Sequence, residues 1–248
     1  MPRFLFSLRW VLGHVLVLLI IGACVVAGFW QLDRLHQRRA FNERVTRQLR
    51  LAPQPLQDVL PASGPVDVKA LSYRRVEVEG TYDSRREVIL VARVLNEQNG
   101  NHVLTPLLTD DGRALIVDRG WVPFQLDQPP VAQASPPAGI VRVVGVLFPP
   151  EVTTSAPRGS PVPQLTRVDL KRLANQLPYP VDPLYLWLQR QDPSPAGNLP
   201  VVAPLPDLTA SPPHLSYAIQ WFTFATIGLV GYPILLRREI QRRNAPGL

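Results

Sequence analysis

The chain has 248 residues, a formal net charge of +7, 28 prolines and a single cysteine. One cysteine excludes a disulfide framework and a cysteine-based zinc or iron–sulfur centre within one chain, and four histidines leave little for a multi-histidine metal site. A net positive charge is typical of proteins that bind nucleic acid, so we first ask where along the chain the charge of +7 lies.

Two long stretches of the sequence carry no formal charge. The first, residues 11–30, would be about 30 Å long as a helix, which matches the hydrocarbon thickness of a bilayer. Trp10 and Trp30 flank it, as interfacial anchors do. The second stretch follows His214 and is also apolar. We therefore predict two transmembrane helices, over residues 11–30 and 214–236.

A cleaved signal peptide is the main alternative for the first stretch. Such a peptide has a shorter apolar core and a cleavage site of small residues. Residues 21–24 faintly resemble a lipoprotein cleavage site, but the apolar run continues past them to Trp30. The continuation favours a helix that is retained as a membrane anchor.

The positive charge is concentrated beside the two predicted helices. The terminal tails, residues 1–10 and 237–248, together carry +5, and residues 33–50 carry +4, whereas residues 51–213 carry −2. Arginines at membrane edges bind lipid phosphates, so membrane lipid is an expected partner and nucleic-acid binding loses its support. Six arginines lie near the helix ends on each side of the membrane, so the positive-inside rule does not fix the orientation.

The segment between the helices begins as a helical extension and continues as a sheet domain. Residues 31–52 are polar and helix-forming with spaced apolar positions, which predicts an amphipathic extension that the following prolines end. Residues 53–213 form the predicted domain, with a short helix at 169–177 capped by Asp169. Alternating apolar and polar positions predict strands at residues 73–82, 87–95, 102–108, 113–119, 140–148 and 184–190.

Proline restricts the remainder of this domain. Twenty of the 28 prolines lie between residues 123 and 213, and proline is excluded from helix interiors and central strands. We therefore expect coil at residues 125–133, 151–162 and 191–211. Short turns between the strands favour antiparallel neighbours. The predicted fold class is an α+β membrane protein, in which two transmembrane helices flank one small antiparallel-sheet domain with Pro-rich loops.

Motifs typical of enzymes do not occur in the sequence. It has no nucleophile elbow, zinc-protease, P-loop or dinucleotide motif, and no nucleophile–base spacing that would support a membrane-tethered hydrolase. We therefore expect that the protein is not an enzyme. Asp118 and Arg119 are interpreted as a strand-end ion pair or turn contact, and His102 as a surface or half-buried residue. His14 lies about one turn inside the first helix, where it is either a functional intramembrane group or a side chain that reaches the interface.

His214 opens the second predicted membrane helix, with Ser211 as N-cap and two prolines between them. Tyr217, Trp221 and Phe224 follow at helical spacing on one face. One interpretation is an aromatic belt with a polar cap. The other is a binding site for a flat apolar ligand at the membrane surface, with the imidazole as a ligand to haem iron and the aromatic rings stacked on the macrocycle.

Three ordered motifs span nearly the whole chain. They are G-x-W-Q-x-x-R at the exit of the first helix, R-G-W-V-P in the middle segment and H-x-x-Y-A-x-x-W at the entry of the second helix. Their main residues are Gly28, Trp30, Gln31, Arg34, Arg119, Gly120, Trp121, His214, Tyr217 and Trp221. With these motifs in this order, the sequence resembles the Surfeit-locus-one family of cytochrome c oxidase assembly proteins.

The resemblance implies an assembly factor in the cell (inner) membrane, with the domain on the outer face and both termini in the cytoplasm. It implies transient binding of haem a, with His214 matching the family's proposed iron ligand. The expected partners are the catalytic subunit of the oxidase, which receives the haem, and other oxidase subunits. The lack of an organellar presequence and the arginine bias indicate a bacterial member.

A second role stays open beside haem delivery. The chain is alternatively a structural scaffold or accessory subunit that binds the oxidase without handling haem. In either role the two helices are expected to pack through small residues, Ala23 and Ala27 on the first and Gly228 and Gly231 on the second.

Overall fold

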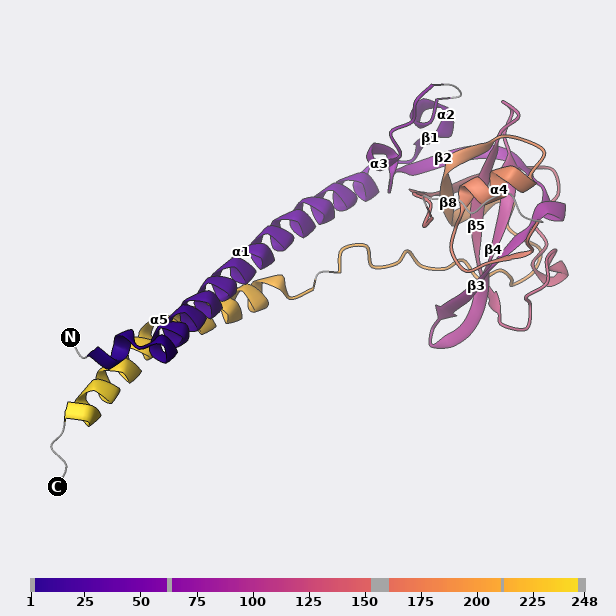
Figure 1. Cartoon of the computed structure of the whole chain (residues 1–248). Coiled ribbons are helices and arrows are strands. Elements are labelled where there is room, and N and C mark those ends of the chain that lie inside the picture. Colours follow the sequence, from indigo (N-terminus) through magenta and orange to yellow (C-terminus); the bar gives the residue numbers. More distant parts are fainter. Residues whose placement is uncertain (1–2, 62–63, 153–160, 211, 245–248) are drawn as a thin grey trace. The chain divides into compact units, whose positions relative to one another are not determined.

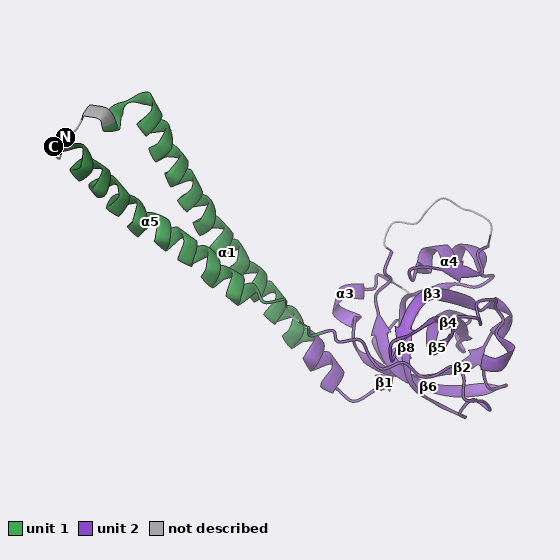
Figure 2. Ribbon diagram, turned by 90° about the horizontal axis from the view of Figure 1, so that it is seen from below, with its two compact units in different colours: residues 1–44, 209–248 green, residues 45–208 purple. Residues whose placement is uncertain are grey.

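The computed structural model describes residues 3–61, 64–152, 161–210 and 212–244 of the chain (Figure 1). It contains two compact units (Figure 2). The first, the helical unit, consists of residues 1–44 and 209–248, and the second, the sheet unit, consists of residues 45–208.

The helical unit is built from two long helices. α1 (Leu8–Arg50), whose residues 45–50 belong to the sheet unit, follows a short 3₁₀ helix, η1 (Arg3–Phe6). α5 (His214–Asn244) is the last element of the chain. Each helix contains an apolar window long enough to cross a membrane, and little of that window is buried. By length and composition, the protein therefore has two candidate membrane-spanning helices, one toward each terminus.

The two helices of this unit pack antiparallel along one seam. Gly28 lies against the Phe222 ring, and Gly228 lies against Ile21. Buried or half-buried residues recur along the seam at steps of three and four: His14, Val17, Ile21, Cys24, Gly28 and Gln31 on α1, and His214, Ala218, Trp221, Ala225, Gly228 and Tyr232 on α5. This heptad-like spacing keeps one face of each helix against its partner.

Small residues make part of this contact, but two of the four expected ones do not. Gly228 lies in the seam, whereas Ala23 is exposed and a Cβ at Gly231 would meet no atom within 4 Å. Cys24 and Gly28 take the buried positions on α1. The reason is geometric, because the three- and four-residue steps of the seam pass through those two positions and leave Ala23 on the outer side.

The described residues of the sheet unit form eight strands in the order β1-β2-β6-β8-β5-β4-β3-β7. Their bounds are β1 (Gln54–Pro55), β2 (Arg75–Tyr82), β3 (Val88–Leu95), β4 (Gln98–Leu108), β5 (Ala114–Pro123), β6 (Ile140–Phe148), β7 (Gln164–Leu165) and β8 (Val181–Asp192). Helical segments join them at α2 (Leu56–Val59), α3 (Val68–Leu71), η2 (Ser84–Arg86), η3 (Ala132–Ala134) and α4 (Leu170–Gln176). Each of the six strands predicted from the sequence is present, with shifts at its ends.

The prediction of a small antiparallel sheet is wrong, because the sheet is mixed. β8 lies between β6 and β5, antiparallel to the former and parallel to the latter. The two short strands, β1 and β7, also pair in parallel, with β2 and β3. A parallel pair needs a long crossover connection. β5 and β8 have one, since β6 and the connection that carries α4 lie between them in the chain.

Five of the strands close on themselves. β2 pairs with β6 along most of its length, and its last two residues pair with β4, Thr81 opposite Leu108 and Tyr82 opposite Leu107. The ring β2-β6-β8-β5-β4 is therefore a small barrel, and β3 and β7 continue the sheet outward from β4.

Side chains alternate between the inside of this barrel and its outer surface. Buried aliphatic residues fill the inside: Val76, Val78, Leu107, Leu115, Val117, Val141, Val143, Leu147, Leu184, Leu186 and Leu188. A second buried cluster joins α4 to the outer surface: Leu170, Leu173, Val88, Leu104, Ile116, Val146, Phe148 and Tyr185. Along β5, neighbouring residues therefore serve different cores, as the two-residue period of a strand requires.

Local sequence signals are confirmed in this unit. Asp169 caps α4, where its carboxylate accepts a hydrogen bond of 3.0 Å from the Arg172 backbone N–H. The turn between β3 and β4 is shorter than predicted, because Asn96 and Glu97 both adopt positive φ and form a tight two-residue connection. The coil predicted at 151–162 falls largely outside the described residues.

Candidate functional site

His214 is the first residue of α5 and is half-buried in the helical unit. Its Nδ1 lies 2.9 Å from Oε1 of Gln31 on α1. An amide oxygen only accepts hydrogen bonds, so Nδ1 is the donor, and in the neutral imidazole the lone pair then resides on Nε2. Within the part of the chain that the structure describes, Gln31 is the one hydrogen-bond partner of this ring. Histidines that bind metal ions are commonly held through their other nitrogen in this way.

This hydrogen bond joins the first and the last motif of the sequence. Gly28, one turn before Gln31, faces the Phe222 ring, which would lie 2.7 Å from a Cβ at that position. Glycine therefore permits the close approach of α1 and α5 next to His214. Phe29 meets the same ring edge-on, with centroids 5.3 Å apart.

Tyr217 and Trp221, which the sequence places on one face with His214, differ in their surroundings. Trp221 is half-buried along the seam, and its ring centroid lies 6.1 Å from that of Phe224. Tyr217 and Phe224 are each 47% exposed. The start of α5 thus presents a half-buried imidazole beside an exposed aromatic flank rather than one uniform face.

A cationic side chain lies next to the histidine. Arg38 of α1 donates a hydrogen bond of 3.0 Å from Nε to the backbone carbonyl of Ala210, and its Nη2 donates to the same oxygen. Arg38, Ala210, Pro212 and His214 line one shallow cleft of the helical unit. The cleft therefore combines an imidazole with a guanidinium, the groups that a metal-bearing ligand with carboxylates needs.

The remaining residues of the first motif lie on the exposed side of α1. Trp30 is 52% exposed, and the Arg34 guanidinium lies over its ring at 5.5 Å from the centroid. Arg34 also donates to the Gln37 side chain at 3.0 Å. A tryptophan paired with an arginine is suited to the boundary between hydrocarbon and headgroups.

His14 lies at the other end of the same helix pair. Its Nδ1 is hydrogen-bonded to the Tyr232 hydroxyl, and its Nε2 lies 3.3 Å from the backbone oxygen of Leu5. The Trp10 ring is 6.0 Å away between centroids. Both ring nitrogens therefore have protein partners, which accounts for this polar group without a ligand.

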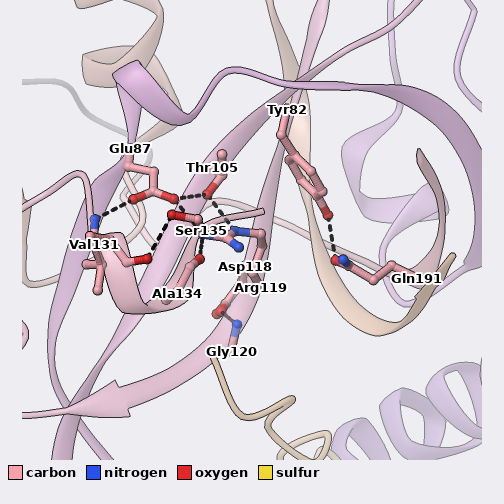
Figure 3. A network of polar contacts seen from close by, with 11 residues as sticks. Tyr82, Glu87, Thr105, Asp118, Arg119, Gly120, Val131, Ala134, Ser135 and Gln191 are labelled. Atoms are coloured by element: carbon pink, nitrogen blue, oxygen red, sulfur yellow. Dashed lines mark hydrogen bonds and ion pairs between the residues drawn. The ribbon is translucent and has the colours of Figure 1, made fainter. Parts of the chain in front are cut away.

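Arg119, from the middle motif, is buried inside the sheet unit (Figure 3). It continues the inward-facing series of β5. Its Nε donates to Thr105 Oγ1 at 2.8 Å, and its Nη2 donates to Glu87 Oε1 at 2.5 Å and to the Ala134 carbonyl at 2.7 Å. Burial lowers the pKa of the Arg119 guanidinium, while the Glu87 carboxylate acts in the opposite direction.

Further contacts extend this network across the barrel. Glu87 accepts hydrogen bonds from the Thr105 hydroxyl at 3.2 Å and from the Val131 backbone N–H at 3.0 Å. The Arg119 guanidinium lies 5.6 Å from the centroid of the Tyr82 ring, which closes the barrel from β2. With exposed fractions of 1% for Arg119 and 5% for Glu87, these groups serve the fold and are not accessible to a ligand.

Asp118 and Arg119 do not form an ion pair with each other, which is one of the two contacts that the sequence suggests for them. Adjacent residues of a strand face opposite sides, and Asp118 lies 2.8 Å from His102 Nδ1 while it also accepts from the Gly120 N–H at 3.1 Å. The expectation of a surface or half-buried His102 is wrong, since the residue is 3% exposed. Asp118 and the Trp187 ring, 5.4 Å away between centroids, enclose it.

Gly120 and Trp121 complete the middle motif as packing residues. Gly120 has a φ of 123°, and a Cβ there would lie 2.2 Å from the Val201 carbonyl oxygen. Trp121 exchanges two backbone hydrogen bonds of 2.8 Å with Val201. Its indole lies so close to Gly100 that a Cβ there would be 2.2 Å from the indole nitrogen. The middle motif therefore fixes the packing of the sheet unit.

Reasoning from the sequence missed the partners of two motif residues. Helical spacing places Gln31 one turn after Gly28, a signal that both face the same neighbour, but it does not identify His214. Glu87 lies 32 residues from Arg119, and no local pattern connects the two. Each pairing depends on tertiary structure.

Comparisons with known proteins agree with the motifs. The model of the SURF1 family matches residues 18–226. The chain is 28% identical to an uncharacterized SURF1-like protein of Mycobacterium bovis, over 98% of this chain and 90% of that protein. It is 26% identical to a SURF1-like protein of Rickettsia felis, over 92% and 97%, and 24% identical to one of Caenorhabditis elegans, over 90% and 74%. The chain therefore belongs to the SURF1 family, which is generally known as a family of cytochrome oxidase assembly factors.

Proposed function

We propose that this protein takes up haem a at the outer face of the cell membrane and presents it to the catalytic subunit of cytochrome c oxidase. The haem is a cargo that is bound transiently and then released. His214 is the iron ligand, and Tyr217 and Trp221 contact the macrocycle.

One observation carries this proposal, the hydrogen bond of 2.9 Å between His214 Nδ1 and Gln31 Oε1. It holds the imidazole at the start of α5 in the tautomer whose Nε2 lone pair is available to a metal. An aromatic belt alone would not need an oriented imidazole. The bond therefore favours the interpretation of His214 as a ligand over that of a polar helix cap.

The surroundings of the histidine suit the remainder of the haem. The exposed ring of Tyr217 and the half-buried ring of Trp221 offer apolar area for a macrocycle. Arg38, which lines the same cleft as His214, supplies a guanidinium for the haem carboxylates. The hydrocarbon tail of haem a is best accommodated in lipid, which suits a site at the end of a membrane helix.

Weak coordination suits a factor that must release its cargo. No group of three or more histidine, cysteine, aspartate or glutamate side chains that could hold a metal ion occurs among the described residues. A single histidine leaves the opposite side of the iron for a ligand from a partner. The catalytic subunit of the oxidase is the partner that we propose, with other oxidase subunits in contact.

The orientation follows from the family resemblance rather than from charge, because arginines are equally frequent on both sides. The sheet unit lies outside the cytoplasm, and both termini lie inside. Alkaline phosphatase fused to the C-terminus would then be inactive, whereas the same enzyme inserted in the exposed turn at Asn96 and Glu97 would be active. The reverse pattern would contradict the orientation.

Absorption spectra of the purified protein test haem binding. The full chain is purified in detergent from cells that make haem a, as wild type, His214→Ala and His36→Ala. His36 is an exposed histidine of α1 and is the matched control. We expect a haem a spectrum in the wild type and in His36→Ala, and its loss in His214→Ala. Gln31→Leu should retain haem but shift its spectrum, because the tautomer of the ligand is no longer fixed.

Two outcomes would contradict the proposal. Full haem occupancy in His214→Ala would exclude this histidine as the ligand. Absence of haem from the wild type, together with stoichiometric co-purification of the mature oxidase, would favour the alternative of a structural scaffold or accessory subunit.

A further inference from the structure

A cleft of about 430 Å³ opens in the sheet unit beside the barrel closure. Its floor is apolar and includes Leu56 of α2, Val78 of β2 and Leu60, which directly follows α2. Its walls are the edge of β2 and the turn between β4 and β5. The volume lies in the range of pockets that bind ligands, and every lining residue belongs to the sheet unit, so the cleft is separate from the site at His214.

The cleft lies where the edge of β2 loses its neighbours. β1 pairs with β2 as far as Glu77, and β4 begins to pair with it at Thr81. Among the described residues no strand pairs with Glu79 on that side, whereas the backbone groups of Val78 and Gly80 point toward β6, because neighbouring residues of a strand direct these groups to opposite sides, and Gly80 also lies against the Leu108 backbone. β4 departs because the chain turns back after Leu108. An interrupted edge of this kind offers backbone groups to an added extended segment.

The walls of the cleft are acidic. Four carboxylates line it: Glu77, Glu79, Asp110 and Asp111. Arg113 is the one basic residue among its lining residues, and it is already shared between Asp111 at 2.8 Å and the buried Asp182 at 3.0 Å. The charge of Arg113 therefore does not neutralise the cleft.

A cation on the neighbouring strand is held weakly. Arg142 of β6 pairs with Glu79 at 2.7 Å and with Glu77 at 3.3 Å, but its side chain is 58% exposed. Exposed ion pairs of this type contribute little and exchange readily with solvent. Asp110 is exposed and makes no hydrogen bond or ion pair with the residues that the structure describes. Negative charge thus remains available beside an apolar floor.

We propose that this cleft binds an extended segment of a partner protein in which an arginine or lysine is flanked by apolar residues. The backbone of the segment pairs with β2 at Glu79. Its cationic side chain lies between Glu79 and Asp110, and an apolar neighbour contacts Leu56 on the floor. Strand pairing supplies affinity, and the carboxylates select the basic sequence.

Fluorescence anisotropy with the full-length protein in a neutral detergent tests this proposal. The probe is a short fluorescein-labelled peptide of alternating valine and arginine, and the same peptide with glutamate in place of arginine is the control. We expect the basic peptide to bind and its dissociation constant to rise with salt. Glu79→Gln combined with Asp110→Asn should weaken binding about tenfold, and Gln57→Arg, which adds a positive charge at the cleft, should weaken it similarly.

A matched control distinguishes binding at this cleft from a general attraction between the basic peptide and any exposed carboxylate. Glu97→Gln removes an exposed carboxylate from the turn between β3 and β4, and it should leave binding unchanged. Equal binding of the two peptides, or unchanged binding in the double variant, would overturn the proposal. If calcium chloride raised the melting temperature of the wild type but not of the double variant, and the basic peptide did not bind, the cleft would be a cation site and the proposal would be wrong.

Discussion

Removal of the Arg119 guanidinium provides a test of the buried network. Arg119→Met keeps an unbranched side chain of similar length but leaves the Glu87 carboxylate, 5% exposed, without its cation. The carboxylate then retains its bonds to the Thr105 hydroxyl and the Val131 N–H. Breaking one side of a buried ion pair costs about 3–5 kcal/mol. We expect a loss of this size in the free energy of unfolding of the sheet unit.

The same value sets the expected shift in melting temperature. For a domain of this size each kcal/mol corresponds to about 2–4 °C, so Arg119→Met should melt roughly 6–20 °C lower than the wild type. Glu87→Gln in the Arg119→Met background removes the uncompensated charge, and we expect it to restore about 2 kcal/mol. Arg142→Met breaks an exposed ion pair instead and should leave the free energy of unfolding nearly unchanged.

These differences in the free energy of unfolding are measured by unfolding the full chain with guanidinium chloride in detergent and monitoring far-ultraviolet circular dichroism. The four corners of the Arg119 and Glu87 cycle give the coupling energy directly. A cost below about 1 kcal/mol for Arg119→Met, or single and double variants that add within about 0.5 kcal/mol, would refute the reasoning. The guanidinium would then be stabilised by packing and not by its charge.

Three further predictions concern stability. Burial raises the pKa of Asp182 from 3.8 to about 6, so the folded state binds this proton more tightly than the unfolded state, and the carboxylate lowers stability once it ionises. Asp182→Asn should therefore leave the free energy of unfolding unchanged below about pH 4 and raise it by at most about 3 kcal/mol above about pH 6. An equal effect at both pH values in urea titrations would contradict this. Gly28→Ala should lower the melting temperature of the helical unit, and Phe222→Leu should restore it, because the added Cβ meets that ring at 2.7 Å; no recovery in the double variant would disprove the clash. Gly120→Ala should cost more than Gly112→Ala in unfolding experiments, because both have positive φ but only the first also meets a backbone oxygen, at 2.2 Å; equal costs would show that the contact does not matter.

Features encoded within a few residues could be predicted from the sequence. The two apolar helices, the strands and the Asp169 cap of α4 depend on local spacing and on a single side chain. The alternation along β5 also held the information that Asp118 and Arg119 face opposite sides. That signal excludes an ion pair between them, although it does not identify their partners.

Features that depend on distant segments could not be predicted. Nothing near residues 184–190 indicates that this strand enters between β6 and β5, because the long connection with α4 permits several positions. The burial of His102 depends on Asp118, which lies 16 residues away on the adjacent strand. At the candidate site, the residue type and position of His214 were evident in the sequence. Its orientation by Gln31, 183 residues away, was not.

The motif residues divide into two groups with different physical roles. Arg119, Gly120 and Trp121 are buried or tightly packed, so their substitution acts on the stability of the sheet unit. His214 is half-buried and Tyr217 is exposed at the start of a candidate membrane-spanning helix, where replacement removes little packing. A variant of the first group should therefore lose protein abundance and oxidase together. A variant at His214 should lose the haem spectrum and oxidase at normal abundance, and only this second pattern would indicate a direct role in haem delivery.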